Sequence, residues 1–323
     1  MLPLEMRRDE KRSMSDHTVM TVTGPVDADQ LGVTAMHEHL LVNLRRVTGI
    51  PDALLEDAEL AVLEIKAFAA AGGRTVVELT NRNLGRQPEG LKQIAEATGL
   101  NIVMGCGWYR EPFYDEEVFV KPTQALADDI IRDIEVGVGP NHIKAGIIGE
   151  IGTDVDYVSP AEERSFRAAA RAHLRTGLTV TTHAPAGRVG LAQLDVLAEE
   201  RMDLRRVVIG HCDRARPTDL DYYMKIIERG AWVQFDLLRE PSDWELDTRV
   251  RLVTSLLAAG GLDHLLVSQD VCTKRHLKMY GGGGYDRLLV EFVPRLLQAG
   301  VSQEQIDILL IGNPRAALTG VRN

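Results

Sequence analysis

The hydrophobic residues of this chain gather in eight short runs that are separated by longer amphipathic stretches. Each run is rich in β-branched or aliphatic residues, and its length is typical of a buried strand. Because longer segments intervene regularly, the pattern predicts strands that alternate with helices. The runs cover residues 32–36, 75–79, 101–105, 142–151, 178–182, 206–210, 231–235 and 264–268.

The stretches between the runs carry apolar residues three and four positions apart, which is the spacing of an amphipathic helix. Several stretches end at a glycine such as Gly72, Gly99 or Gly177, as expected where a helix stops in the left-handed conformation. One predicted helix follows each strand. These helices cover residues 57–71, 90–98, 123–136, 160–176, 189–199, 218–228, 247–259 and 286–299.

Eight strand–helix units predict an α/β protein with a parallel (β/α)8 TIM barrel, and a doubly wound open sheet is the alternative. Before the first unit, a short apolar run and Gly24-Pro25 predict a β-hairpin that could plug one end of the barrel. Residues 1–18 are polar and charged without a period, which predicts a poorly ordered tail. We therefore expect residues 19–323 to form a single barrel domain.

Polar residues that can bind metals stand at or just beyond the ends of five of the eight runs. In a barrel these ends meet at one mouth, where catalytic residues gather. His37 and His39 are two residues apart, so in a strand both side chains point to the same side. A histidine pair alone also fits two hydrogen-bonded side chains, but the coincidence at several strand ends favours a metal site. The candidates are His37, His39, Glu150, His183, His211 and Asp270.

Composition limits the partners of the chain. It has 323 residues, 45% of them hydrophobic, which is enough for a sizeable core. A formal net charge of −10 argues against nucleic acid as a partner. No apolar run is long enough to span a membrane, no signal peptide begins the chain, and three cysteines are an odd number for a disulfide framework. We expect a cytoplasmic protein that acts on a small molecule.

Five motifs in the order MHEHLLVN, KAGIIGEIGTD, TTHAPAG, IGHCDR and SQD resemble the phosphotriesterase-like branch of the amidohydrolase superfamily. The resemblance covers residues 24–314 and implies a homodimeric barrel with two divalent ions per chain, usually Zn2+, with Mn2+, Co2+ or Fe2+ as alternatives. It also implies a bridging carboxylate and a bridging hydroxide. By the resemblance, His37, His39 and Asp270 would hold a buried ion, and His183 and His211 a more exposed one.

Strand four offers two candidates for the bridging group, Lys144 and Glu150. In the triesterases proper the bridge is a carbamylated lysine. In one continuous strand the two side chains would lie roughly 20 Å apart, at about 3.3 Å per residue, so only one could face the ions. Glu150 stands at the end of the strand, as the other candidates do. It therefore fits the subgroup of phosphotriesterase homology and phosphotriesterase-related proteins, which carry glutamate there.

Cationic and aromatic residues follow several strands and are candidates for binding the substrate. Arginine and lysine suit an anionic group, although ordinary solvated loop charge is the alternative for each one. Trp108 and Tyr109 would wall the pocket. The candidates are Trp108, Tyr109, Arg110, Lys274, Arg275 and Lys278.

Three functions follow from this pattern. The first is a binuclear metal-dependent hydrolase that opens a lactone, with Asp270 as proton acceptor. The second keeps the site and cleaves a phosphotriester or an amide. The third is a metal-stabilised binding protein without turnover. Among other polar residues, we expect Glu38 to be structural and paired with a cation, His173 and His264 to be bystanders, and the cysteines to be buried.

Overall fold

The computed structural model describes residues 18–214, 219–239 and 242–321. Eight parallel strands form one sheet whose neighbours follow the order of the sequence. This order excludes the doubly wound sheet, in which the order reverses. The strands are β3 (Thr34–Glu38), β6 (Thr75–Glu78), β7 (Asn101–Cys106), β8 (Ile147–Gly152), β9 (Val180–His183), β10 (Val207–Gly210), β11 (Trp232–Phe235) and β12 (Leu265–Val267).

The sheet closes where the residues after β12 meet β3. The backbone amide of Asp270 donates to the carbonyl of His37 at 3.1 Å, and that of His39 donates to the carbonyl of Val271 at 3.2 Å. Glu38 reinforces the join because its buried carboxylate accepts the backbone amides of Gln269 and Val271. The predicted (β/α)8 barrel is confirmed. The expectation that Glu38 pairs with a cation is wrong, since backbone amides and the Ser268 hydroxyl satisfy it instead.

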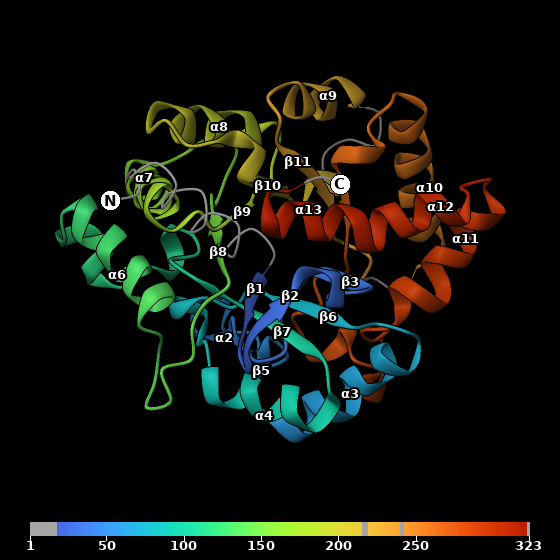
Figure 1. Ribbon diagram of the computed structural model, residues 1–323, viewed down its shortest axis with the longest axis horizontal. Coiled ribbons are helices and arrows are strands. Elements are labelled where there is room, and N and C mark those ends of the chain that lie inside the picture. The colour runs from blue at the N-terminus through green and yellow to red at the C-terminus, as the bar shows by residue number, and fades with distance from the viewer. Residues whose placement is uncertain (1–17, 215–218, 240–241, 322–323) are drawn as a thin grey trace, which may run out of the picture.

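Helices surround the strands on the outside (Figure 1). Local sequence explains several starts: Asp57 caps α3, and Ser159 with Glu162 forms a capping box at α7. The eighth predicted helix begins as a π-helical turn at 288–292. The helices are α2 (Arg45–Thr48), α3 (Ala58–Ala70), α4 (Pro88–Thr98), α5 (Glu116–Val120), α6 (Thr123–Glu135), α7 (Pro160–Thr176), α8 (Val189–Glu199), α9 (Leu220–Glu228), α10 (Asp243–Ala258), α11 (Val293–Gln298), α12 (Gln303–Asp307) and α13 (Asn313–Thr319).

Strand four is shorter than its apolar run predicts. The run at 142–151 predicts a strand over its whole length, but β8 begins only at Ile147. Ile143 instead forms an isolated antiparallel bridge with Val138, and the register between β8 and β9 shifts after Ile148. The assumption of one continuous strand through Lys144 and Glu150 is therefore wrong. Lys144 lies before β8, and Glu150 lies within it.

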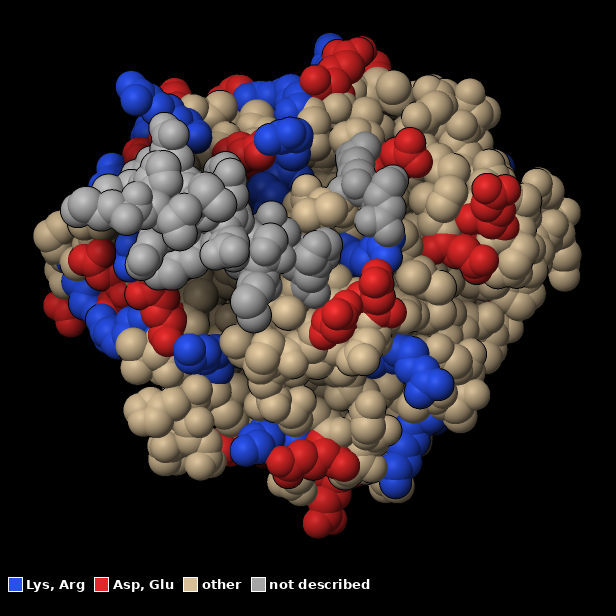
Figure 2. Space-filling model, viewed as in Figure 1, with Lys and Arg blue, Asp and Glu red and all other residues tan. Residues whose placement is uncertain are grey.

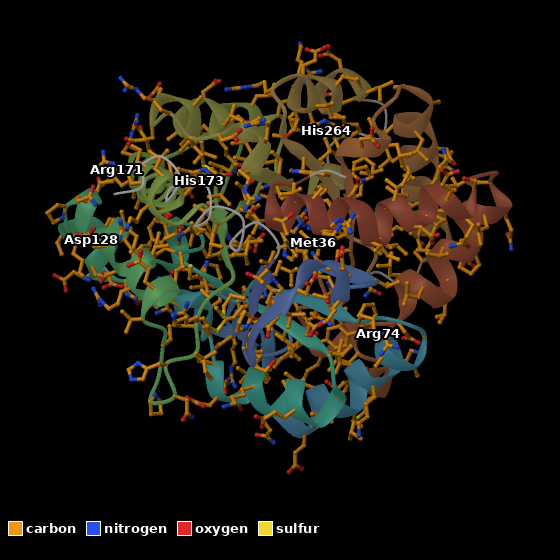
Figure 3. All side chains as sticks on the ribbon, viewed as in Figure 1. Met36, Arg74, Asp128, Arg171, His173 and His264 are labelled. Atoms are coloured by element: carbon orange, nitrogen blue, oxygen red, sulfur yellow. The ribbon has the colours of Figure 1, made fainter. Side chains whose placement is uncertain are left out.

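An apolar cluster, here called the plug, fills the barrel toward the N-terminal ends of its strands. The hairpin of β1 (Thr18–Thr21) and β2 (Gly24–Asp27) contributes Val19, and α13 contributes Ala317. Figure 1 shows both elements on the face viewed, and Figure 3 places Met36 between them. The predicted hairpin is thus present at one end of the barrel. The plug comprises Val19, Ala28, Leu31, Met36, Val77, Leu79, Val103, Ile147, Val208, Trp232, Leu266, Ala316, Ala317 and Leu318.

The outer surface carries charges of both signs. Acidic and basic side chains are interspersed over the face shown in Figure 2. Many form local pairs, such as Arg295 with Asp247 at 2.6 Å and Arg167 with Glu163 at 2.7 Å. Among the described helices, none combines the length and apolar character needed to cross a bilayer. Except for Thr18 in β1, the predicted tail at 1–18 lies outside the described residues.

Candidate metal centre

Six side chains from five strand ends meet at the mouth opposite the plug, all of them nearly inaccessible to solvent. Glu150 lies at their centre. Its Oε1 is 2.7 Å from Nδ1 of His183, 3.0 Å from Nε2 of His211 and 3.8 Å from Nε2 of His37. This one oxygen therefore faces histidines of both ion sites expected from the sequence.

Asp270 completes the group on the other side. Its Oδ1 is 3.4 Å from Nε2 of His39 and 3.8 Å from Nε2 of His37. Asp270 and His211 both have left-handed backbones, with φ of 54° and 57°. Such angles are unfavourable for residues other than glycine, and they concentrate where function fixes a side chain. Here they occur at two of the six candidates.

The donor set fits two divalent ions. His37, His39 and Glu150 form one group whose ligand atoms lie within 4.8 Å of one another, and Glu150, His183 and His211 form a second. Nε2 of His37 is buried without a hydrogen-bond partner, which is costly unless another group binds there. Imidazole and carboxylate are ligands that zinc and other transition metals share. The residues present therefore suit such ions.

Two residues that the sequence analysis missed orient these histidines. The carboxylate of Asp236, directly after β11, accepts hydrogen bonds from Nδ1 of His37 and from Nδ1 of His211, each at 2.7 Å. Thr80, two residues after β6, lies 2.9 Å from Nδ1 of His39. Both stand at strand ends, so the rule that found the other candidates also points to them. They were missed because the expected ligand set was already complete without them.

Burial and charge set the protonation of the group. Burial lowers the pKa of His39 to about 4 and that of His183 to about 3, so both imidazoles are neutral. Burial alone would also lower the pKa of His211, but the carboxylates of Asp236 and Glu150 raise it to about 9. Burial alone would raise the pKa of Glu150, but His183 and His37 hold it well below its usual range. The carboxylate at the centre is therefore ionised.

A cavity of about 200 Å³ opens above the centre. Tyr109 and Arg110 line it as predicted, and the Tyr109 hydroxyl lies 3.1 Å from Nδ1 of His183. Arg110 forms an ion pair with Asp154, another lining residue. The full wall is His39, Leu44, Thr48, Leu84, Tyr109, Arg110, Glu150, Asp154, His183, Pro185, His211, Arg214, Arg239, Asp270 and Cys272.

Four of the predicted substrate-binding residues do not line this cavity. The Trp108 indole is buried and donates to Glu117 at 3.1 Å. Lys278 pairs with Asp286, and Lys274 lines a separate hollow beside α3. Arg275 is the fourth; its backbone amide reaches Asp52. The loop after β12 thus directs its cations away from the centre, and two other arginines take their place.

These two cations are Arg214 after β10 and Arg239 after β11. Arg239 forms an ion pair with Oδ2 of Asp270, the oxygen that faces away from the histidines. Arg214 is exposed at the rim, and no ion pair joins its guanidinium to another of the described residues. The positive charge predicted near the pocket is therefore present, but apart from Arg110 it comes from the residues after β10 and β11.

The sequence model of the phosphotriesterase family matches residues 17–318. The chain belongs to the phosphotriesterase family. Its identity with the phosphotriesterase homology protein of Escherichia coli (strain K12) is 38% over 286 residues, which cover 88% of this chain and 97% of that protein. Its identity with the N-acetyltaurine hydrolase of Danio rerio is 30% over 348 residues, which cover 93% of this chain and 97% of that protein.

Solved structures of similar proteins agree. The E. coli phosphotriesterase homology protein, crystallised with phosphate in its active site, superposes with a TM-score of 0.85 at 37% identity and covers 90% of this chain and 99% of its own. The structure of a lactonase from Listeria monocytogenes superposes with a TM-score of 0.86 at 27% identity. The match covers 93% of this chain and 98% of the lactonase. The predicted family is confirmed, and this member of it is a metal-dependent hydrolase.

Other residues in this family member that could suggest chemistry have structural roles. Nδ1 of His173 lies 2.7 Å from the carbonyl of Leu178, and Nδ1 of His264 lies 3.1 Å from that of Ala231. Figure 3 shows both histidines away from Met36. The three cysteines are buried and free, as expected.

Proposed function

We propose that the chain hydrolyses a small anionic lactone at a centre of two divalent ions, by breaking the bond between the carbonyl carbon and the ring oxygen. His37, His39 and Asp270 would hold the buried ion, and His183 and His211 the more exposed one. The observation that carries this proposal is the position of Glu150, whose Oε1 faces His37 from one group and His183 and His211 from the other. Lys144, which lies before β8, is not part of the proposal.

Zn2+ is the first choice for both sites, with Mn2+, Co2+ or Fe2+ as alternatives, because the donors are imidazole and carboxylate. When bound, such a pair lowers the pKa of a shared water molecule and polarises the oxygen of the substrate carbonyl.

The residues of the chain would supply the remaining steps. Asp270 lies beside the space between His37 and His39, so it can accept the proton of the attacking water and return it to the leaving alkoxide. The ion pair with Arg239 holds the other oxygen of Asp270 and so fixes the direction of the carboxylate. Tyr109, next to His183, lies where its hydroxyl can hydrogen-bond the substrate.

The charge of the substrate follows from the rim of the cavity. Arg214 is exposed there and has no ion-pair partner among the described residues, so a carboxylate, sulfonate or phosphate of the substrate can bind it. Arg110 cannot serve equally well because Asp154 already neutralises it. We therefore place the anionic end of the substrate at Arg214 and the reacting carbonyl below it.

Hydrolysis of an N-acyl amide is the second candidate. Relatives named N-acetyltaurine hydrolase are 28% and 30% identical to this chain over more than nine tenths of its length. An N-acyl amino acid or sulfonic acid also has an anionic end and a carbonyl to attack. Phosphotriester hydrolysis remains a side reaction of the same centre. The binding protein without turnover is not retained, because the chain is a hydrolase.

The experiment is a substrate panel with purified, metal-loaded protein. It compares kcat/KM for aliphatic and sugar lactones with and without a carboxylate or phosphate, for N-acyl amino acids and N-acetyltaurine, and for paraoxon. Anionic lactones should be turned over fastest. Faster cleavage of N-acyl amides would replace the first proposal by the second, and no cleavage of either would contradict both.

Assembly and location are further expectations. A cytoplasmic homodimer follows from the resemblance and composition described above, and light scattering on the eluting protein would test the dimer.

A further inference from the structure

Asp236 connects the two halves of the candidate metal centre without belonging to either set of expected ligands. Its side chain is completely buried. Oδ2 lies 2.7 Å from Nδ1 of His37, and Oδ1 lies 2.7 Å from Nδ1 of His211. His37 belongs to the buried ion site and His211 to the exposed one. A single carboxylate therefore contacts one histidine of each site.

This contact fixes the tautomer of both rings. Each oxygen of Asp236 faces one Nδ1 atom at 2.7 Å, and the oxygens of an ionised carboxylate only accept hydrogen bonds. Each Nδ1 must then carry the hydrogen and donate it. The Nε2 atom of each ring then faces Glu150 at the centre, at 3.8 Å in His37 and 3.0 Å in His211, so this is the atom that would bind an ion.

The position of Asp236 is itself held from three directions. Gln234 donates to its Oδ2 at 2.9 Å, and the backbone amide of His211 donates to its Oδ1 at 3.1 Å. Its own amide donates to Asp213, which in turn binds Nε of Arg249 on α10 at 2.8 Å. The carboxylate therefore cannot follow one histidine without moving relative to the other.

His39 provides a contrast within the same centre. Its Nδ1 lies 2.9 Å from the hydroxyl of Thr80, which itself donates to Glu78 at 2.6 Å. This support reaches one histidine of the buried site and none of the exposed site. Thr80 and Asp236 thus provide a matched pair: one supports a single ion site, and the other supports both.

We infer that Asp236 is a positioning residue that couples the two ions, so that its loss weakens binding at both sites together. This inference rests on the proposed binuclear centre. It assigns the coupling to a residue directly after β11, one of the three strand ends that contribute no expected ligand. Partners of this kind are worth about 10–100-fold in metal affinity.

The test compares Asp236→Asn with Thr80→Val by calorimetric titration of metal-free protein with Zn2+. Asparagine keeps the shape but offers one acceptor, so one ring must turn its Nδ1–H away or move its hydrogen to Nε2. Asp236→Asn should weaken both binding steps by about 10–100-fold. Thr80→Val should weaken one step by a similar factor and leave the other within about twofold, because it touches one site only.

Three results would decide the matter. Weakening of one step only in Asp236→Asn, or of neither, would overturn the coupling while leaving the binuclear centre intact. Fewer than two ions bound by the unaltered protein would overturn the proposed function and the coupling with it. If circular dichroism shows that Asp236→Asn does not fold, Gln234→Leu takes its place, and equal, smaller weakening of both steps is expected. If Gln234→Leu weakened only one metal-binding step, or neither, the coupling would be overturned.

Discussion

The two ends of the barrel are built from the same strands but differ in what they bury. Toward the N-terminal ends the interior is the plug, in which Met36, Val208 and Leu266 pack against the hairpin and α13. One to four residues further along the chain, in the strand or just after it, stand His37, His211 and Asp270. The plug stabilises the fold by burying apolar surface, whereas burying unpaired polar atoms costs free energy. The polar residues at the mouth therefore cannot be explained by the stability of the fold alone.

This difference predicts that substitutions at the mouth change chemistry and that substitutions at the plug change stability.

Asp270→Asn should have the largest effect. Loss of the proton acceptor should lower kcat by roughly 10²–10⁴-fold, measured with the best substrate of the panel, while the unfolding temperature of the metal-free protein stays close to that of the parent. Asp263→Asn is the matched control, because it removes the same charge just before β12, where Asp263 is exposed. Retention of near-parental kcat in Asp270→Asn would show that another group accepts the proton.

Glu150→Gln should have the next largest effect, and it should act through metal content. Removing the charge of the group shared by both sites should weaken binding by more than the roughly 10–100-fold expected for an outer partner. Lys144→Met should leave the metal content unchanged because Lys144 lies before β8. Metal analysis after dialysis measures both variants. The reverse order would make Lys144 the bridge.

Arg214→Gln should have a smaller effect. Removing the rim cation should raise KM for an anionic lactone by about tenfold, which corresponds to roughly 1.4 kcal/mol, and leave kcat nearly unchanged. A neutral lactone of the same ring size should be affected little. Equal changes for both substrates would mean that Arg214 does not contact the anionic end.

Met36→Ala should have the smallest effect on turnover and the largest on stability. Its side chain is buried in the plug, so its loss should lower the free energy of unfolding by about 2–5 kcal/mol. Metal content and kcat at 25 °C should remain those of the parent. Denaturant unfolding and metal analysis check this, and a loss of metal without a loss of stability would contradict the separation of the two ends.

The sequence predicted the mouth better than the surrounding loops. His37, His183 and Asp270 could be found because polar residues stood at the ends of apolar runs, and barrel geometry brings such ends together. Asp236 followed the same rule and was passed over because no ligand was needed from β11. Only the contacts across the barrel show that it serves two histidines.

The loop residues could not be placed in the same way. Lys278 follows Asp270 closely in the sequence, but the loop turns back toward α3, where the Lys278 amide reaches Glu64 and its side chain pairs with Asp286. The path of a loop depends on such distant partners, and local pattern does not contain them. For the same reason the start of β8 was misplaced, because Ile143, near the start of the predicted strand, pairs with Val138 instead.

The most direct test of the binuclear centre is anomalous X-ray diffraction from crystals of the purified protein, collected on both sides of the absorption edge of the metal that fluorescence identifies. We predict two anomalous peaks with Glu150 between them, one next to His37 and His39 and the other next to His183 and His211. No peak at this mouth, or a single peak that Glu150 does not contact, would contradict the account.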